Sequence, residues 1–187
     1  MAANGISFMP RFVVLLRAIN VGGHNVVKGK LQEAFVSMDF REVSTYKQSG
    51  NIIFETDIAS PEEVKKIVEE TLLGVLGFEV GSFVRTLPQL KKILQSDPFK
   101  GQDTEGTSFL ITFLEHAPAA FPLKLPLSIP NSTAEIISAV GTEVFSVTRG
   151  QGDGGKPNPF LESKLKTQAT TRNLNVIREI VKRNSEE

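Results

Sequence analysis

Short apolar runs alternate with apolar residues at helical spacing in the N-terminal half of the chain. Residues 12–16 form a compact apolar run with β-branched side chains, which is typical of a buried strand. Leu31, Phe35 and Met38 recur at helical spacing and predict a helix after a polar loop. The same patterns predict further strands at 43–48, 52–56 and 78–85, and further helices at 61–76 and 88–95.

The clearest helix start in the sequence is at Ser60. Ser60 is a suitable N-cap, Pro61 fits the first helical position, and two glutamates follow where the helix dipole favours negative charge. Gly77 can end the same helix. Up to Arg85 the predicted order is β-α-β-β-α-β, the split β-α-β unit of ferredoxin-like folds.

The C-terminal half begins with the same pattern and then departs from it. A strand is predicted at 109–114 and a hairpin at 134–140 and 144–148, but the proline-rich segment 118–130 between them is poorly suited to a long helix. A glycine-rich loop and two helices follow the hairpin, at 159–166 and 173–183. We interpret this half as a degenerate second copy of the same unit.

The predicted fold class is therefore α+β, with two ferredoxin-like units, mainly antiparallel sheets and C-terminal helices. The boundary is placed in residues 97–105, which contain a proline and a glycine and lack apolar periodicity. We expect residues 1–8 to be an extension or a tag-like tail, 9–97 the first unit, and 98–187 the second unit with its C-terminal helices.

Composition narrows the range of possible functions. The 187 residues are 40% hydrophobic and 22% charged, as in soluble globular proteins. Lys plus Arg and Asp plus Glu both number 21, so net charge directs the chain neither to nucleic acid nor to membranes. The chain has no cysteine, which excludes disulfides and thiolate chemistry. No apolar stretch approaches membrane-spanning length and no secretion signal is recognisable, so we expect a cytoplasmic protein without a membrane partner.

Polar residues gather at strand ends that the predicted topology brings together. In a split β-α-β unit the first two strands run in the same direction and the third returns beside the first, so Arg17, Gln48 and Asn51 should share one end of the sheet. Arg85 should lie at the opposite end. The predicted ligand-binding residues at this end are Arg17, Asn20, Gly22, Gly23, Ser49, Gly50 and Asn51.

Each of these residues also has a purely structural interpretation. The paired glycines can serve a loop that needs positive φ, Ser49 and Gly50 can form a hairpin turn, and Asn51 can satisfy the backbone of its own turn. Arg17 can pair with a carboxylate such as Glu55. An arginine together with several amide donors nevertheless favours a pocket for an anionic or polar ligand.

A second polar segment, 170–173, precedes the last predicted helix. Thr171 is expected to cap that helix, and a helix N-terminus bearing Arg172 is suited to anions. Thr171, Arg172 and Asn173 are therefore added to the predicted ligand-binding residues. If the two segments meet, Arg17 and Arg172 would form a clamp for phosphate or carboxylate.

Two features of the sequence look like signs of catalytic or metal chemistry, but each lacks a residue or a spacing that such chemistry requires. Residues 150–156 have the spacing of a phosphate-binding loop, but Pro157 follows where a magnesium-binding Ser or Thr is required, so a mobile loop over the ligand site is favoured. The only histidines, His24 and His116, are far apart and lack metal-ligand spacing. We predict no metal and no cofactor, and the sequence leaves open whether the protein is an enzyme.

Three segments carry a resemblance to a known family. Residues 15–23 (LLRAINVGG), 45–51 (TYKQSGN) and 170–173 (TTRN) resemble the hallmark segments of the bacterial domain-of-unknown-function 1697 family. The likeness extends from about Met9 to Arg183. It implies an α+β protein of two ferredoxin-like units, and it implies no established activity.

The sequence thus favours a cytoplasmic protein that binds a small anionic or polar ligand at the strand ends between its two units. One alternative is a non-catalytic interaction or oligomerisation module, in which the polar strand ends form a subunit contact and the protein is a homo-oligomer. The other is a single-stranded nucleic-acid binder, which the absence of Trp and the presence of one Tyr make unlikely.

Overall fold

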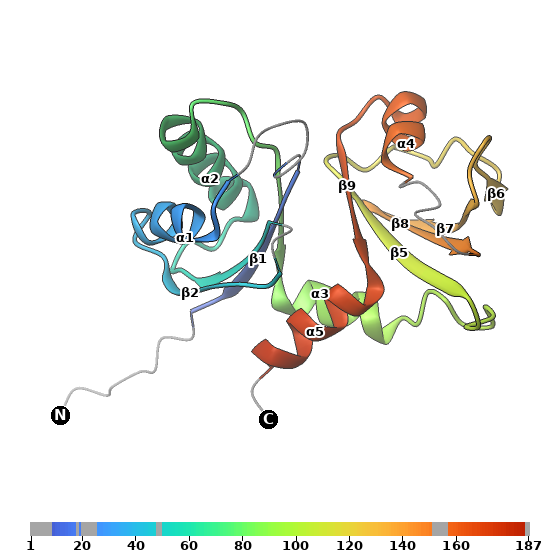
Figure 1. Ribbon diagram of the computed structural model, residues 1–187, viewed down its shortest axis with the longest axis horizontal. Coiled ribbons are helices and arrows are strands. Elements are labelled where there is room, and N and C mark those ends of the chain that lie inside the picture. The colour runs from blue at the N-terminus through green and yellow to red at the C-terminus, as the bar shows by residue number, and fades with distance from the viewer. Residues whose placement is uncertain (1–8, 18, 20–25, 48–49, 151–156, 186–187) are drawn as a thin grey trace. The chain divides into compact units, whose positions relative to one another are not determined.

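The computed structural model describes residues 9–17, 19, 26–47, 50–150 and 157–185. The chain divides into two compact units, Met1–Gln89 and Leu90–Glu187. The described residues contain five helices and two mainly antiparallel sheets, so the predicted α+β class is confirmed (Figure 1). None of these helices is long and apolar enough to cross a membrane.

The first unit has the predicted order β-α-β-β-α-β. Its sheet has the strand order β2-β3-β1-β4, and β1 runs antiparallel to both β3 and β4. A further helix, α3, follows β4 directly and crosses the boundary, with residues 90–95 belonging to the second unit. The elements are β1 (Arg11–Leu16), α1 (Lys28–Val36), β2 (Arg41–Thr45), β3 (Asn51–Glu55), α2 (Pro61–Leu76), β4 (Ser82–Thr86) and α3 (Leu87–Gln95).

The core of the first unit lies between one face of the sheet and helices α1 and α2, which lie on the same side of it (Figure 1). Phe54 is at its centre, with ring centroids 4.2 Å from Phe40, 5.5 Å from Phe35 and 6.1 Å from Phe12. Helix α2 begins and ends as predicted: the Ser60 hydroxyl accepts a hydrogen bond from a backbone N–H in the first turn, and the chain leaves the helix with positive φ at the predicted glycine.

The second unit has a five-stranded sheet in the order β6-β7-β8-β5-β9. Within the described residues no helix lies between β5 and β7, and the proline-rich segment contributes only the short strand β6, as its composition predicted. The elements are β5 (Thr107–Leu114), β6 (Leu127–Ser128), β7 (Ala134–Val140), β8 (Glu143–Arg149), α4 (Asn158–Leu165), β9 (Ala169–Asn173) and α5 (Leu174–Asn184).

The prediction that Thr171 caps the last helix is wrong. Residues 169–173 form strand β9, which pairs antiparallel with β5, and the N-cap of α5 is Asn173, whose side chain accepts a 2.9 Å hydrogen bond from the N–H of Asn175. The β-branched threonines favour the extended strand, and the Thr112 and Thr171 hydroxyls lie 2.8 Å apart across it. The sequence analysis therefore missed the last strand of the second unit.

The two units repeat the same sheet register. In the first, the N–H of Leu16 donates to the carbonyl of Gly50 over 2.8 Å. In the second, the N–H of Leu114 donates to the carbonyl of Thr142 over 2.8 Å. Leu16 and Leu114 end their strands and pair with the first residue of β4 and β9, respectively. The central strands β1 and β5 thus occupy equivalent positions in the two sheets.

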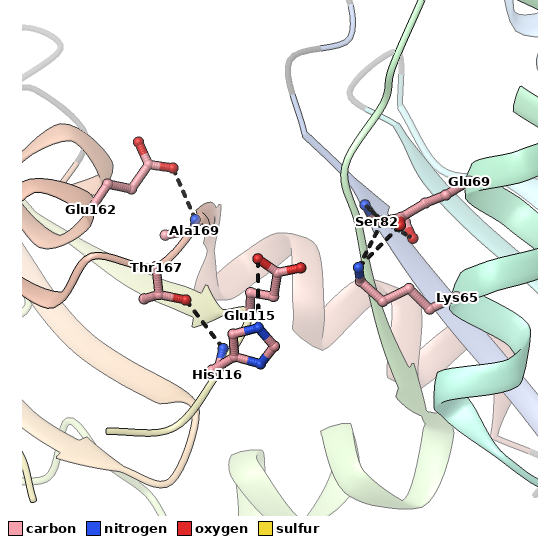
Figure 2. Close-up of polar contacts among 8 residues, drawn as sticks. All are labelled: Lys65, Glu69, Ser82, Glu115, His116, Glu162, Thr167 and Ala169. Carbon is pink, nitrogen blue, oxygen red and sulfur yellow. Dashed lines mark hydrogen bonds and ion pairs between the residues drawn. The ribbon is translucent and has the colours of Figure 1, made fainter. Parts of the chain in front are cut away.

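A carboxylate contact is repeated as well, and Figure 2 shows both copies. Glu69 on α2 accepts a 2.8 Å hydrogen bond from the N–H of Ser82, the first residue of β4. Glu162 on α4 accepts a 2.9 Å hydrogen bond from the N–H of Ala169, the first residue of β9. Each helix therefore fixes the start of the strand that follows it, which supports the interpretation of the chain as a repeated unit.

Candidate functional site

The first polar segment meets the hairpin turn at one end of the first sheet. The N–H of Leu16 donates a hydrogen bond to the carbonyl of Gly50, and the N–H of Arg17 donates to the carbonyl of Gly81 over 2.8 Å. The Arg17 side chain is half-buried. Asn51 lies opposite the penultimate residue of β1. We call Arg17, Gly50 and Asn51 the first-unit rim; the topology brings Arg17 to the other two although it lies more than thirty residues before them in sequence.

The opposite end of the sheet carries a different set of charges. Arg85 pairs with Val13, toward the start of β1, as the topology argument predicted. Glu55 lies opposite Arg11, and their side chains form an ion pair. The alternative in which Arg17 pairs with Glu55 is therefore wrong, because the antiparallel register places Glu55 at the far end of β1.

Asn51 has a structural role in the hairpin. Its side chain is 1% exposed, and its Nδ2 donates a 2.9 Å hydrogen bond to the carbonyl of Tyr46. The N–H of Tyr46 donates in turn to the carbonyl of Asn51 over 3.0 Å. These contacts agree with the structural interpretation of Asn51, in which its side chain satisfies the backbone of its own turn. Asn51 therefore stabilises the rim from the buried side of the hairpin.

Gly50 is the tightest point of the rim. Its φ is +67°, and a Cβ added there would lie 2.9 Å from the Cβ of Leu16. Positive φ and this close approach both require glycine. The hairpin turn can therefore pack directly against the end of β1.

Thr45 was not singled out in the sequence. Its Oγ1 is buried and has no hydrogen-bond partner among the described residues. Thr45 pairs with Ile52, so its side chain lies on the core-facing side of the sheet, close to the turn. The sequence does contain a signal for this residue: a hydroxyl side chain at a strand position that faces the core, next to a polar loop.

Several predicted positions lie outside the residues that the structure describes. These are Asn20, Gly22, Gly23 and Ser49 of the predicted ligand-binding set, together with His24 and residues 151–156 of the glycine-rich loop.

Arg172 is buried in the second sheet, with 8% of its surface exposed. Its Nη1 donates to the Thr170 hydroxyl over 2.8 Å and to the Thr171 carbonyl over 3.0 Å. Burial of the guanidinium lowers the pKa of Arg172 to about 10. The equivalent Arg85 makes the same contact with the preceding carbonyl, at 2.8 Å. The Arg172 side chain therefore makes its hydrogen bonds within its own strand, to Thr170 and Thr171.

The lowered pKa of Arg172 predicts a pH dependence of stability. Between the folded-state pKa of about 10 and the higher unfolded-state value, the unfolded chain binds more protons, so stability rises with pH. We expect the free energy of unfolding of the wild type, minus that of Arg172→Met, to increase by about 1 kcal/mol from pH 8 to 10.5. Urea unfolding of both proteins at several pH values measures this difference. A difference that is flat or falls with pH would contradict the prediction.

The equivalent end of the second sheet carries the opposite charge. The N–H of Glu115 donates to the carbonyl of Gln168 over 2.9 Å, as Arg17 does to Gly81 in the first unit. The exposed His116 lies beside it, with its Nε2 4.0 Å from Glu115 Oε2, and Figure 2 shows the pair. Of these two equivalent positions, only Arg17 is a cation. Within the described residues, no group of His, Asp and Glu side chains is arranged to hold a metal ion.

Comparison with known proteins places this fold in a family. The model described as "Protein of unknown function (DUF1697)" matches residues 9–145. Among solved structures, the conserved bacterial protein SP0830 from Streptococcus pneumoniae is similar, with a TM-score of 0.64 and 20% sequence identity over 94% of this chain and 98% of that one. That likeness shows the fold alone. No curated protein matches the sequence. The chain belongs to the DUF1697 family of proteins of unknown function.

Proposed function

We propose that the protein binds a small anionic or polar ligand at the first-unit rim, with Arg17 as its principal charged contact. The observation that carries the proposal is the pair of backbone bonds from Leu16 to Gly50 and from Arg17 to Gly81, which hold three chain segments at one end of the sheet. A half-buried guanidinium held on a rigid strand end is suited to carboxylate or phosphate groups.

The rim is supported from the core side. Glu69 accepts hydrogen bonds from both the N–H and the hydroxyl of Ser82, directly after Gly81, so the start of β4 is fixed. Thr45 contributes a buried hydroxyl without a partner among the described residues, close to the hairpin turn. A fixed frame loses little conformational entropy when a ligand binds, which favours affinity for a small molecule.

The proposal is confined to the first unit. The two-arginine clamp was an expectation from sequence, and the guanidinium of Arg172 already donates to Thr170 and Thr171 in its own strand. At the equivalent end of the second sheet Glu115 stands where Arg17 stands in the first. The Glu115 carboxylate would repel an anionic ligand. We therefore expect one ligand per chain, bound at the first-unit rim.

The exposed apolar side chains favour a small ligand over a nucleic acid. In the described part of the chain the large exposed ones are all aliphatic: Val27, Val36, Leu73, Val75 and Val140. Sheets that bind single-stranded RNA stack bases on exposed aromatic rings. Phe12, Phe35 and Phe40 of the first unit instead pack into its core around Phe54.

The test is a thermal-unfolding screen of phosphorylated and carboxylated metabolites. A true ligand at a hundredfold excess over its Kd is expected to stabilise the protein by about 2.7 kcal/mol. The Arg17→Ala variant is expected to lose that stabilisation, because it removes the charged contact. Isothermal titration should give one site per chain.

Arg41→Ala is the matched control. Arg41 is exposed and lies opposite Glu55, at the other end of the same sheet, so its removal changes net charge equally and leaves the rim intact. Ligands that stabilise Arg17→Ala as strongly as the wild type would refute the assignment. A gel shift with single-stranded oligonucleotides at low salt that disappears in Arg17→Ala would support the nucleic-acid alternative instead.

A further inference from the structure

Lys47 brings a second cation to the hairpin of the first-unit rim. Its side chain is exposed, and its Nζ lies 5.7 Å from the centroid of the Tyr46 ring. Among the residues that the structure describes, no carboxylate forms an ion pair with this ammonium. An ammonium that rests on an aromatic ring and is not neutralised by an acid keeps its charge for an anion.

The Tyr46 ring, and with it the Lys47 ammonium, lies on the sheet face opposite α1 and α2. Thr45 pairs with Ile52, which belongs to the core under these helices. The next pair is Tyr46 with Asn51, because the N–H of Tyr46 donates to the carbonyl of Asn51. Successive residues of a strand point to opposite faces of the sheet, so Tyr46 faces away from that core.

Arg17 lies on the same face as Tyr46. Leu16 belongs to the helix-covered core, and Arg17 extends the pairing of β1 with β4 by one residue through its bond to Gly81. Arg17 therefore alternates with Leu16 and faces away from the helices. Only β3 separates β1 from β2, so the two strands that carry the cations are about 10 Å apart. The long side chains of arginine and lysine can reach one anion from positions at this distance.

The second unit shows that the repeated fold does not require these two cations. Its equivalent hairpin, between β7 and β8, pairs Val140 with Glu143 where the first unit pairs Tyr46 with Asn51. Glu115 takes the place of Arg17, as described above. The same sheet register therefore forms with two carboxylates at this end. The cations of the first unit are a local feature of its rim, which favours a role in binding.

The backbone at Lys47 has a conformation that is unfavourable for lysine. Its φ is +55°, in the left-handed region that glycine adopts with less strain. Strained positions of this kind are common at ligand sites. The strain also supplies a test, because glycine at this position would relieve the backbone while removing the charge.

We propose that Lys47 is the second cation of the ligand site at the first-unit rim, and that this site selects a phosphate monoester over a carboxylate. The inference rests on the proposed function, in which Arg17 is the principal charged contact. A phosphate monoester carries nearly two negative charges at neutral pH and has three free oxygens, so two cations from different strands can each bind an oxygen of their own. A carboxylate has one charge and two oxygens, and a single guanidinium can bind both.

Phenyl phosphate and benzoate are the probes, because they share a ring and differ in the anionic group. Calorimetric titrations at neutral pH and constant ionic strength give both affinities. We expect the wild type to bind phenyl phosphate at least about tenfold more tightly than benzoate. Lys47→Gln is expected to weaken phenyl phosphate binding about tenfold and to leave benzoate binding nearly unchanged. Arg17→Ala is expected to lose both.

Two further variants separate binding from charge and from folding. Arg41→Gln removes an exposed cation from the other end of β2, so it lowers net charge equally and should leave both affinities unchanged. Lys47→Gly should keep its Tm while losing affinity for phenyl phosphate, since it relieves the positive φ. A fall in Tm of more than about 4 °C in Lys47→Gly would show that the turn itself needs the lysine, and would overturn the proposal.

The outcomes distinguish this inference from the rim proposal. Selectivity for phenyl phosphate that persists in Lys47→Gln, while Arg17→Ala loses binding, would overturn the role of Lys47 and leave the rim proposal standing. Equal weakening in Lys47→Gln and Arg41→Gln would show an effect of net charge and would also overturn it. If the wild type shows no saturable binding of phenyl phosphate, the assigned ligand class is wrong, and the metabolite screen decides the rim proposal by itself. Binding of both probes that survives Arg17→Ala would refute the rim itself.

Discussion

Phe54→Ala is expected to destabilise the first unit by about 4 kcal/mol, the largest effect of a single truncation that we anticipate. The side chain is fully buried and its ring lies against Phe12, Phe35 and Phe40. Truncation removes the transfer free energy of the ring and leaves a cavity that three large neighbours cannot fill without leaving their rotamers. Calorimetry should show the loss in the transition that belongs to the first unit.

Phe78→Ala is the matched control for this truncation. Phe78 belongs to the same cluster but is only partly buried, so its removal is expected to cost less than half as much. Equal losses for the two variants, or a loss of under about 1 kcal/mol for Phe54→Ala, would mean that α1 does not depend on this ring for its packing.

The first unit was predictable because its local signals agree with one another. The apolar run at 12–16, the cap at Ser60 and the glycine after α2 each predict one element, and the crossover rule then orders the strands. Strand bounds were less accurate: the strand predicted at 78–85 begins at Ser82. Its start depends on the contact with Glu69, a tertiary interaction that no local pattern encodes.

The second unit was harder to predict because its last strand is short and polar. Residues 169–173 have no apolar alternation, and threonines before an apolar helix look like a cap. What makes them a strand is pairing with β5, about sixty residues earlier in the chain. Recognition of the repeat would have supplied the missing strand, because Arg172 holds the place in β9 that Arg85 holds in β4.

The candidate site was predictable in position and less so in chemistry. Topology places Arg17, Gly50 and Asn51 together, but sequence cannot tell a donor that faces a ligand from one that closes a turn. Asn51 closes the turn to Tyr46.

Gly50→Ala is expected to destabilise the first unit by roughly 2–4 kcal/mol and to abolish ligand binding at the first-unit rim. Two costs combine: an L-residue at a φ of +67°, and a methyl group 2.9 Å from the Cβ of Leu16. The backbone can relieve the contact only by moving the turn away from β1, which breaks the 2.8 Å bond between the Leu16 N–H and the Gly50 carbonyl.

Gly77→Ala separates the two costs. Gly77 has a φ of +78°, but an added Cβ there meets nothing within 4 Å, so only the backbone term, about 1 kcal/mol, is expected. The excess loss in Gly50→Ala then measures the close approach of the turn to β1, by urea unfolding under identical conditions. If both variants lose the same free energy of unfolding, the hairpin turn can move away from β1 without cost, which would contradict the prediction. If Gly50→Ala instead retains the metabolite binding that Arg17→Ala loses, the ligand contacts Arg17 without the hairpin turn. Only the ends of β1 and β4 would then form its binding site.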